Sequence, residues 1–324
     1  MLTDISGSDA IYCSSVAEER ELETVWIPEM IRRDSISILG AISAKTSRIQ
    51  IAPGILNVYS RTPALIAMTL LTLQELSGGR LVAGLSSGNP DYIREIHGMK
   101  YSDNIQRLRE TIAIVRETLS SENISYSGKI FTIKRWAPKF SNIQPFPIYV
   151  GAHNPKLLEF VGEAGDGVIL NLVSPHNVST ARRIIQDSEE KHGRRKGSVD
   201  ISSILMIAID VDPAVAEKRV RRQVAFYLAR SRQIRKRFLN SKFAEEISKT
   251  EKALINGRQD DIASELSREF VNEIAVFGNK RDVEQRLLEY EKSGLDQAIF
   301  YIAGWMGDPR QFTERLLGFI DLKK

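Results

Sequence analysis

The chain has 324 residues, 42% of them hydrophobic and 27% charged, a composition typical of a globular protein with a large buried core. Its 45 basic and 41 acidic residues leave a net charge of +4, a balance too even for a dedicated nucleic-acid-binding protein. Cys13 is the single cysteine, which excludes an internal disulfide bond and any multi-cysteine metal centre.

The sequence also argues against export and membrane insertion. The first ten residues lack the basic start and apolar run of a signal peptide. The longest apolar stretch, 64–76, is shorter than a membrane span and is interrupted by polar residues. We therefore expect a cytoplasmic protein with no bound metal, no membrane contact and no nucleic-acid partner.

Short β-branched runs alternate along the chain with longer amphipathic stretches, which is typical of βα units around a parallel sheet. Strands are predicted at 24–28, 48–56, 80–86, 148–151, 167–173, 201–211 and 296–303. Helices are predicted at 10–22, 35–44, 62–76, 104–119, 155–164, 175–191, 281–293 and 309–320. This alternation predicts a (β/α)8 TIM barrel that forms a single domain over residues 1–324.

The N-terminal strand and two insertions depart from the simple alternation. A closed barrel needs a strand before the first helix, and only residues 1–6 are available for it. Either residues 2–6 form a short strand or the chain begins upstream of this Met1, and we favour the second. Residues 125–134 predict an inserted hairpin with Gly128 in its turn. Residues 213–270 lie between the predicted strands 201–211 and 296–303, the seventh and eighth of the barrel when the N-terminal strand is counted. They predict a helical cap because they are too long for an ordinary connection.

Small and polar residues follow three of the predicted strands. Gly54 lies where a strand enters a polar loop, and glycine permits close approach of a flat ring. The next strand ends at residues 86–88, Ser-Ser-Gly, whose hydroxyl and N–H groups could bind an anion. Asn154 and Pro155 begin a helix whose free N–H groups face the loop of residues 151–154. Ordinary strand ends and helix caps explain the same residues without a ligand.

Two residues are candidates for acid–base catalysis. Glu29 follows a strand end, so its carboxyl group should reach the barrel mouth and could protonate a substrate. The alternative is a helix-capping glutamate or one paired with Arg32 or Arg33. His97 lies in a loop after the fourth strand, where a histidine is commonly a surface residue.

The basic stretch 218–237 predicts the solvated face of an amphipathic helix. The alternative is a cationic cap near the entrance to the barrel, which would attract an anionic cofactor tail or substrate. Nucleic-acid binding is the third and least favoured interpretation of this stretch.

The run 57–88, NVYSRTPALIAMTLLTLQELSGGRLVAGLSSG, resembles the luciferase-like monooxygenase superfamily. The similarity is to its deazaflavin-dependent branch, which uses coenzyme F420 and includes the methylenetetrahydromethanopterin reductases. Supporting stretches lie at 25–29, 149–156 and 162–168, and the resemblance returns at 276–281 and 294–304.

The resemblance implies a non-proline cis peptide bond at Gly54–Ile55 that supports the cofactor ring, with the cofactor phosphate near the loop 151–155. The implied cofactor-binding residues are Gly54, Ile55, Asn57, Ser86, Ser87, Gly88, Gly151, Ala152, His153 and Asn154. The implied reaction is hydride transfer between F420 and a small organic substrate, with Glu29 as the acid. Alternatives are an FMN-dependent monooxygenase that uses reduced flavin and oxygen, and a non-catalytic flavin-binding relative. The family dimerises through helices near 62–76, and this helix is apolar nearly all round, so we expect a homodimer.

Overall fold

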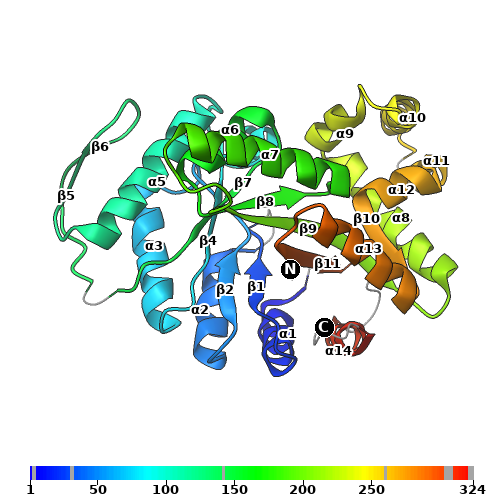
Figure 1. Cartoon of the computed structure of the whole chain (residues 1–324), viewed down its shortest axis with the longest axis horizontal. Helices are drawn as coiled ribbons and strands as arrows, with labels where there is room; N and C mark the ends of the chain where they lie inside the picture. Colours follow the sequence, from blue (N-terminus) through cyan, green and yellow to red (C-terminus); the bar gives the residue numbers. More distant parts are fainter. Residues whose placement is uncertain (2–4, 30–32, 141–142, 259–260, 303–308, 320–324) are drawn as a thin grey trace.

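Parallel strands follow one another around a barrel, with helices on its outside (Figure 1). The structure, a computed structural model, describes residues 1, 5–29, 33–140, 143–258, 261–302 and 309–319. The barrel strands are β1 (Thr24–Ile27), β2 (Gln50–Pro53), β3 (Leu56–Asn57), β4 (Ala83–Ser86), β7 (Ile148–Gly151), β8 (Gly167–Asn171), β9 (Asp200–Ile209) and β11 (Gln297–Ile302). Hydrogen bonds join β1 to β2, β3 to β4, and then β4, β7, β8, β9 and β11 in turn, while a bridge between Ile51 and Leu81 joins β2 to β4. The TIM-barrel prediction is confirmed.

Helices surround the strands, and all of those given next except α4 lie where the sequence predicts them. They are α1 (Gly7–Glu19), α2 (Ser35–Lys45), α3 (Pro63–Leu76), α4 (Pro90–Glu95), α5 (Asn104–Ser120), α6 (Pro155–Ala164), α7 (Pro175–Lys191), α13 (Lys280–Lys292) and α14 (Pro309–Phe319). The starts of α6 and α7 agree with the prediction because each has a capping side chain, Asn154 or Ser174, directly before a proline.

Three local predictions were wrong or incomplete. The predicted strand 48–56 is divided into β2 and β3, because the cis Gly54–Ile55 bond interrupts it. The strand β10 (Ala275–Gly278) was not predicted, and it pairs in parallel with the C-terminal half of β9. The one-and-a-half-turn helix α4 was also missed. Both elements are too short to show a clear hydrophobic period.

In the described part of the chain, no ladder hydrogen bonds join β11 to β1 at the seam where these two strands face each other. The amino group of Met1 lies beside it and donates a hydrogen bond to the carbonyl oxygen of Phe300 at 2.8 Å. Burial lowers the pKa of this amino group to about 5. Residues 2–4, most of the predicted short first strand, lie outside the described residues. Ser6 caps α1 by accepting a hydrogen bond from Asp9 N–H.

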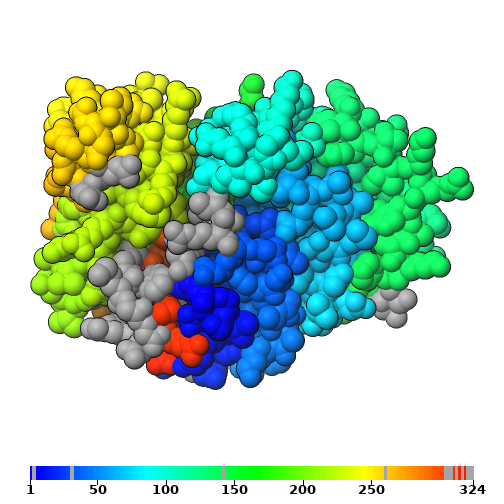
Figure 2. Space-filling view, turned by 180° about the vertical axis from the view of Figure 1, so that it is seen from behind, coloured from blue at the N-terminus to red at the C-terminus, as the bar shows by residue number. Residues whose placement is uncertain are grey.

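The helical insertion forms a second hydrophobic cluster at one end of the molecule, whereas the hairpin projects at the other end (Figure 1). Its helices are α8 (Pro213–Arg230), α9 (Arg232–Phe238), α10 (Ala244–Ile255), α11 (Ile262–Glu265) and α12 (Arg268–Ile274). Phe238, Phe243 and Phe270 pack edge to face in its centre. Figure 2 shows the insertion helices, in yellow, beside the cyan part of the chain that contains α4. The hairpin strands β5 (Ile124–Ser127) and β6 (Thr132–Trp136) are antiparallel, as predicted.

Arg80, which lies within the run 57–88 that carries the resemblance, is a structural residue. Its guanidinium donates to the carbonyl oxygens of Ile49 at 2.6 Å, Thr46 at 2.9 Å and Ser43 at 3.0 Å. These bonds join the end of α2 to the start of β2, at the barrel end opposite to the C-terminal strand ends. The Ser-Gly-Gly-Arg block therefore supports the fold and lies away from the pocket described below.

No helix in the described part of the chain is long and apolar enough to cross a membrane. The same residues contain no group of three or more His, Cys, Asp or Glu side chains placed to hold a metal ion.

Candidate cofactor and active site

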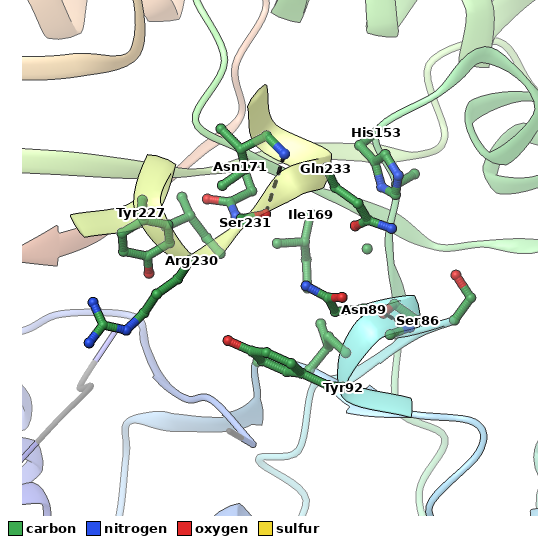
Figure 3. Close-up of a pocket in the computed structure, with 18 of the residues that line it drawn as sticks. Ser86, Asn89, Tyr92, His153, Ile169, Asn171, Tyr227, Arg230, Ser231 and Gln233 are labelled. Atoms are coloured by element: carbon green, nitrogen blue, oxygen red, sulfur yellow. Dashed lines mark hydrogen bonds between the residues drawn. The ribbon is translucent and has the colours of Figure 1, made fainter. Parts of the chain in front are cut away.

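A cavity of about 300 Å³ opens at the C-terminal ends of the barrel strands (Figure 3). The ends of β4, β7 and β8 form its base, and the α8–α9 elbow of the insertion forms a wall. Active sites of TIM barrels lie at this end, and the volume is within the range of small-molecule sites. We call this cavity the strand-end pocket.

The floor of the strand-end pocket contains the Gly54–Ile55 peptide bond, which is cis as the resemblance implied. Gly54 N–H donates a hydrogen bond to Ile27 O at 2.8 Å, which ties this bond to the end of β1. A Cβ atom on Gly54 would lie only 3.1 Å from the Trp26 ring and from Met1 Cε. The floor is therefore packed tightly from below.

Small residues form one side of the strand-end pocket. Ser86, Ser87 and Gly88 follow β4, and Gly151 lies beside them on β7. Gly88 has a φ of 71°, and its N–H donates to Ser86 Oγ at 2.9 Å. A Cβ on Gly151 would lie 3.0 Å from Ser86 Cβ. Side chains at these glycines would collide with neighbouring residues, so this side of the pocket is built from small residues.

Most of the predicted cofactor-binding residues line this one cavity: Gly54, Ile55, Ser86, Ser87, Gly88, Gly151, Ala152 and His153. Asn57 and Asn154 are not among its described lining residues. Asn57 Oδ1 accepts hydrogen bonds from the N–H groups of Tyr59 and Ser60, at 3.0 and 2.8 Å. Asn154 Oδ1 accepts from Leu157 N–H at 3.0 Å. The side chains of both asparagines hold a turn and a helix start, and their part in cofactor binding stays a prediction.

Glu29 lies on the rim of the barrel, two residues after β1, but it is not among the described lining residues. Its carboxylate is paired with Arg61, and it also accepts a hydrogen bond from Ser35 Oγ at 3.2 Å. Arg61 also contacts Asp34 at 2.8 Å. Glu29 is therefore paired locally, with Arg61 as its described partner; Arg32 lies outside the described residues, and the acid role of Glu29 stays a prediction.

His97 lies in an exposed position just after α4, and it is not among the described lining residues of the pocket. Its placement gives no support to a catalytic role. The neighbouring Tyr92, on α4, does line the pocket and was not predicted.

The insertion forms a wall of the pocket whose individual residues were not predicted. This wall consists of Tyr227 and Arg230 from α8 and Gln233 and Arg237 from α9, and Tyr301 from β11 also lines the pocket. Tyr227 and Arg230 lie on the opposite side of the cavity from Ser86 and His153 (Figure 3). The basic stretch 218–237 has two kinds of residue: Lys218, Arg222 and Lys236 are exposed to solvent, as a solvated helix face predicts, whereas Arg230 and Arg237 line the pocket.

The electrostatic character of the strand-end pocket is positive. None of its described lining residues is acidic. Arg237 donates to the carbonyl oxygens of Asn171 and Leu172, both at 2.8 Å, and burial lowers its pKa to about 10. The surrounding protein, and then the positive charge of Arg237, lower the pKa of His153. This corner of the pocket is suited to an anionic group.

The TIM barrel and the cis peptide bond on the pocket floor are the features that the resemblance to the luciferase-like oxidoreductases implied. A family model described as "Luciferase-like monooxygenase" matches residues 4–297. The chain belongs to this family.

The sequence relatives of this chain are similar to one branch of the family, and a solved structure shows the same fold. The chain is 28% identical to 5,10-methylenetetrahydromethanopterin reductase of Archaeoglobus fulgidus over 300 residues, which cover 91% of this chain and 90% of the relative. It is 32% identical to the reductase of the same name from Methanolobus tindarius, over 67% of each chain. The structure of the coenzyme F420 dependent tetrahydromethanopterin reductase from Methanopyrus kandleri superimposes with a TM-score of 0.89 at 22% identity, covering 99% of this chain and 96% of that one.

Proposed function

We propose that this protein is a coenzyme F420-dependent oxidoreductase that transfers hydride to or from a small organic substrate, as a methylenetetrahydromethanopterin reductase does. The observation that carries the proposal is the strand-end pocket, a cavity that small residues line on one side and a cation lines at one corner. The names of the sequence relatives support the choice of F420 and of this substrate class.

The residues present fit such a cofactor. Ile55 and the glycines at 88 and 151 offer a flat bed for a tricyclic ring, and the corner beside His153 and Arg237 offers positive charge for a phosphate. When bound, F420 supplies the carbon that donates or accepts the hydride. The chain orients the ring, and the α8–α9 elbow limits the access of water. Glu29, on the rim, is the proposed proton donor to the substrate.

Titration of the purified protein with F420 and with FMN tests this proposal. We expect F420 to bind at least about tenfold more tightly than FMN, a difference of about 1.4 kcal/mol. Quenching of the intrinsic deazaflavin or flavin fluorescence measures both affinities. Tight retention of FMN without affinity for F420 would contradict the proposal and favour the FMN-dependent monooxygenase. Binding of F420 without turnover on any reduced-pterin substrate would favour the non-catalytic relative.

We also propose that the protein forms a homodimer through α3. Its outer face exposes Leu65, Met68 and Leu76 to 44%, 40% and 56%. These positions follow one another at helical spacing along the side that faces away from the barrel. Such an apolar stripe on a barrel helix is typical of a covered surface.

Substituting Met68→Glu should therefore convert a dimer into a monomer, because it places a charge in the centre of the apolar stripe. Size-exclusion chromatography with light scattering measures the molar mass directly. Leu288→Glu is the matched control, since Leu288 is 52% exposed on α13, and it should leave the mass unchanged. A wild-type protein that is monomeric, or a Met68→Glu protein that remains dimeric, contradicts the α3 interface.

A further inference from the structure

Arg237 is a pocket-lining cation whose charge no described carboxylate neutralises. Many of the other arginines contact acidic side chains, such as Arg219 with Asp210 and Arg235 with Glu251. The described bonds of Arg237 go to two main-chain carbonyl oxygens, of Asn171 and Leu172. Carbonyl groups orient a guanidinium but do not cancel its charge. A largely buried charge without a counter-charge is costly unless an anion accompanies it.

The geometry around Arg237 fixes where such an anion would lie. The two hydrogen bonds hold its guanidinium at the end of β8, the strand next to β7. His153 follows β7 directly, and its pKa responds to the charge of Arg237. The N-terminus of α6, a ten-residue helix, begins two residues after His153. The positive end of the helix and the guanidinium therefore act on the same corner of the strand-end pocket.

The other pocket cation does not belong to this corner. Arg230 packs over the Phe226 ring, with 3.6 Å between its guanidinium carbon and the ring centroid. It lies with Tyr227 on the side of the cavity away from His153 (Figure 3). Arg237 is thus the lining arginine that lies near His153 and the end of β8.

We propose that Arg237 of the helical insertion binds the phosphate group of the cofactor, and that the insertion thereby contributes directly to cofactor affinity. The inference rests on the proposed function and adds a binding residue to it. A guanidinium presents paired N–H donors that match two phosphate oxygens, and it remains charged throughout the physiological pH range. Arg237 is a binding residue with no part in the hydride transfer.

The test compares two ligands that differ in the phosphate. F420 carries a phosphodiester and a glutamate tail, whereas its fragment FO has the same ring and ribityl chain without them. Removing the guanidinium with Arg237→Gln should weaken F420 binding roughly 10- to 100-fold, the usual effect of losing charge-assisted hydrogen bonds. Binding of FO should change by less than about twofold, since FO offers no anion to this corner. Fluorescence titration measures both dissociation constants.

Two further variants separate charge from structure. Arg237→Lys should retain part of the F420 affinity, because it keeps a positive charge without the paired donors. Lys236→Gln removes one charge from the exposed face of the same helix and should leave both dissociation constants unchanged. A thermal melt of each variant reports whether the elbow still folds.

Each outcome decides the proposal. Equal weakening of F420 and FO by Arg237→Gln would show a structural role and overturn it, as would unchanged F420 binding. A third ligand, the fragment of F420 that keeps the phosphodiester but lacks the glutamates, should lose as much affinity for Arg237→Gln as F420 does. If its affinity changes as little as that of FO, Arg237 binds the glutamate carboxylates, and the proposal is overturned. Should the wild type bind FMN in place of F420, the proposed function fails, and the comparison of FMN with riboflavin tests Arg237 in the same way.

Discussion

Replacing Glu29 with glutamine is expected to lower the turnover of the F420-dependent reaction by about 10²- to 10⁴-fold, the usual contribution of a positioned acid. Glutamine has nearly the same shape and can still accept hydrogen bonds from Arg61 and Ser35, the present partners of the carboxylate. It cannot donate the proton that a carboxylic acid supplies. Affinity for F420 should stay within about twofold, because Glu29 is not among the described lining residues of the pocket.

Steady-state oxidation of reduced F420, with 5,10-methylenetetrahydromethanopterin as the first acceptor to be tried, measures this effect. Asp34→Asn is a close control because Asp34 contacts the same arginine and caps α2, and asparagine caps a helix equally well. This control should retain nearly full turnover. If Glu29→Gln and Asp34→Asn behave alike, the Glu29–Arg61 pair only holds the rim together, and the acid must be sought elsewhere.

Glu110→Gln should reduce the free energy of unfolding by about 2–4 kcal/mol, since it disrupts several charge-assisted hydrogen bonds in a buried place. The Glu110 side chain, on α5, is fully buried. Its carboxylate accepts hydrogen bonds from the N–H groups of Lys129, Ile130 and Phe131, at 2.7 to 3.1 Å, and from Gln106 Nε2 at 2.8 Å. An amide nitrogen in this position would oppose N–H donors of the hairpin turn. Urea denaturation measures the loss.

The contribution of Glu110 also depends on pH. Burial alone would raise the pKa of its carboxyl group, but the hydrogen bonds from Gln106 and the three backbone N–H groups outweigh burial and hold the pKa below its usual value near 4.5. A carboxyl group with a lowered pKa in the folded state stabilises the fold above its unfolded pKa, and this stabilisation is lost as the pH falls. The difference between wild type and Glu110→Gln should therefore be constant near neutral pH and shrink below about pH 4.5.

Glu117→Gln, on the same helix, serves as the comparison. Glu117 is only partly buried, and its one described backbone contact, with Ser125 N–H, is long at 3.4 Å. Its replacement should cost less than about 0.5 kcal/mol at any pH. A Glu110 variant as stable as this control would show that the hairpin turn does not depend on the buried carboxylate.

The fold was predictable because its signals are local. The starts of α6 and α7 follow from a capping residue before a proline, and the buried strands follow from apolar runs between glycines. The position of the cis bond at Gly54–Ile55 came from family resemblance, since an Ala-Pro-Gly-Ile segment is compatible with a trans bond as well. The strand β10 was missed because four apolar residues after a helix do not differ from one more helical turn.

The pocket was predictable only on the side formed by strand ends. Loops after parallel strands meet at one rim, so Ser86 and His153 were expected to lie together. The opposite wall depends on how α8 and α9 pack against the barrel, and no local pattern separates Arg230 and Arg237 from the solvated lysines and arginines around them. Asn57 and Asn154 show a second limit of sequence reasoning, since residues that form turns and helix caps near a pocket need not line it.

The strand-end pocket takes its lining from segments spread between Gly54 and Tyr301. A nascent chain therefore acquires the complete cavity only after nearly all of its residues have left the ribosome. In the finished protein, a ligand held between these distant segments opposes the opening of the barrel as a whole. A saturating ligand at a hundred times its dissociation constant would add about 2.7 kcal/mol to global stability. A thermal-shift screen would then reveal ligands of this site without any knowledge of the reaction.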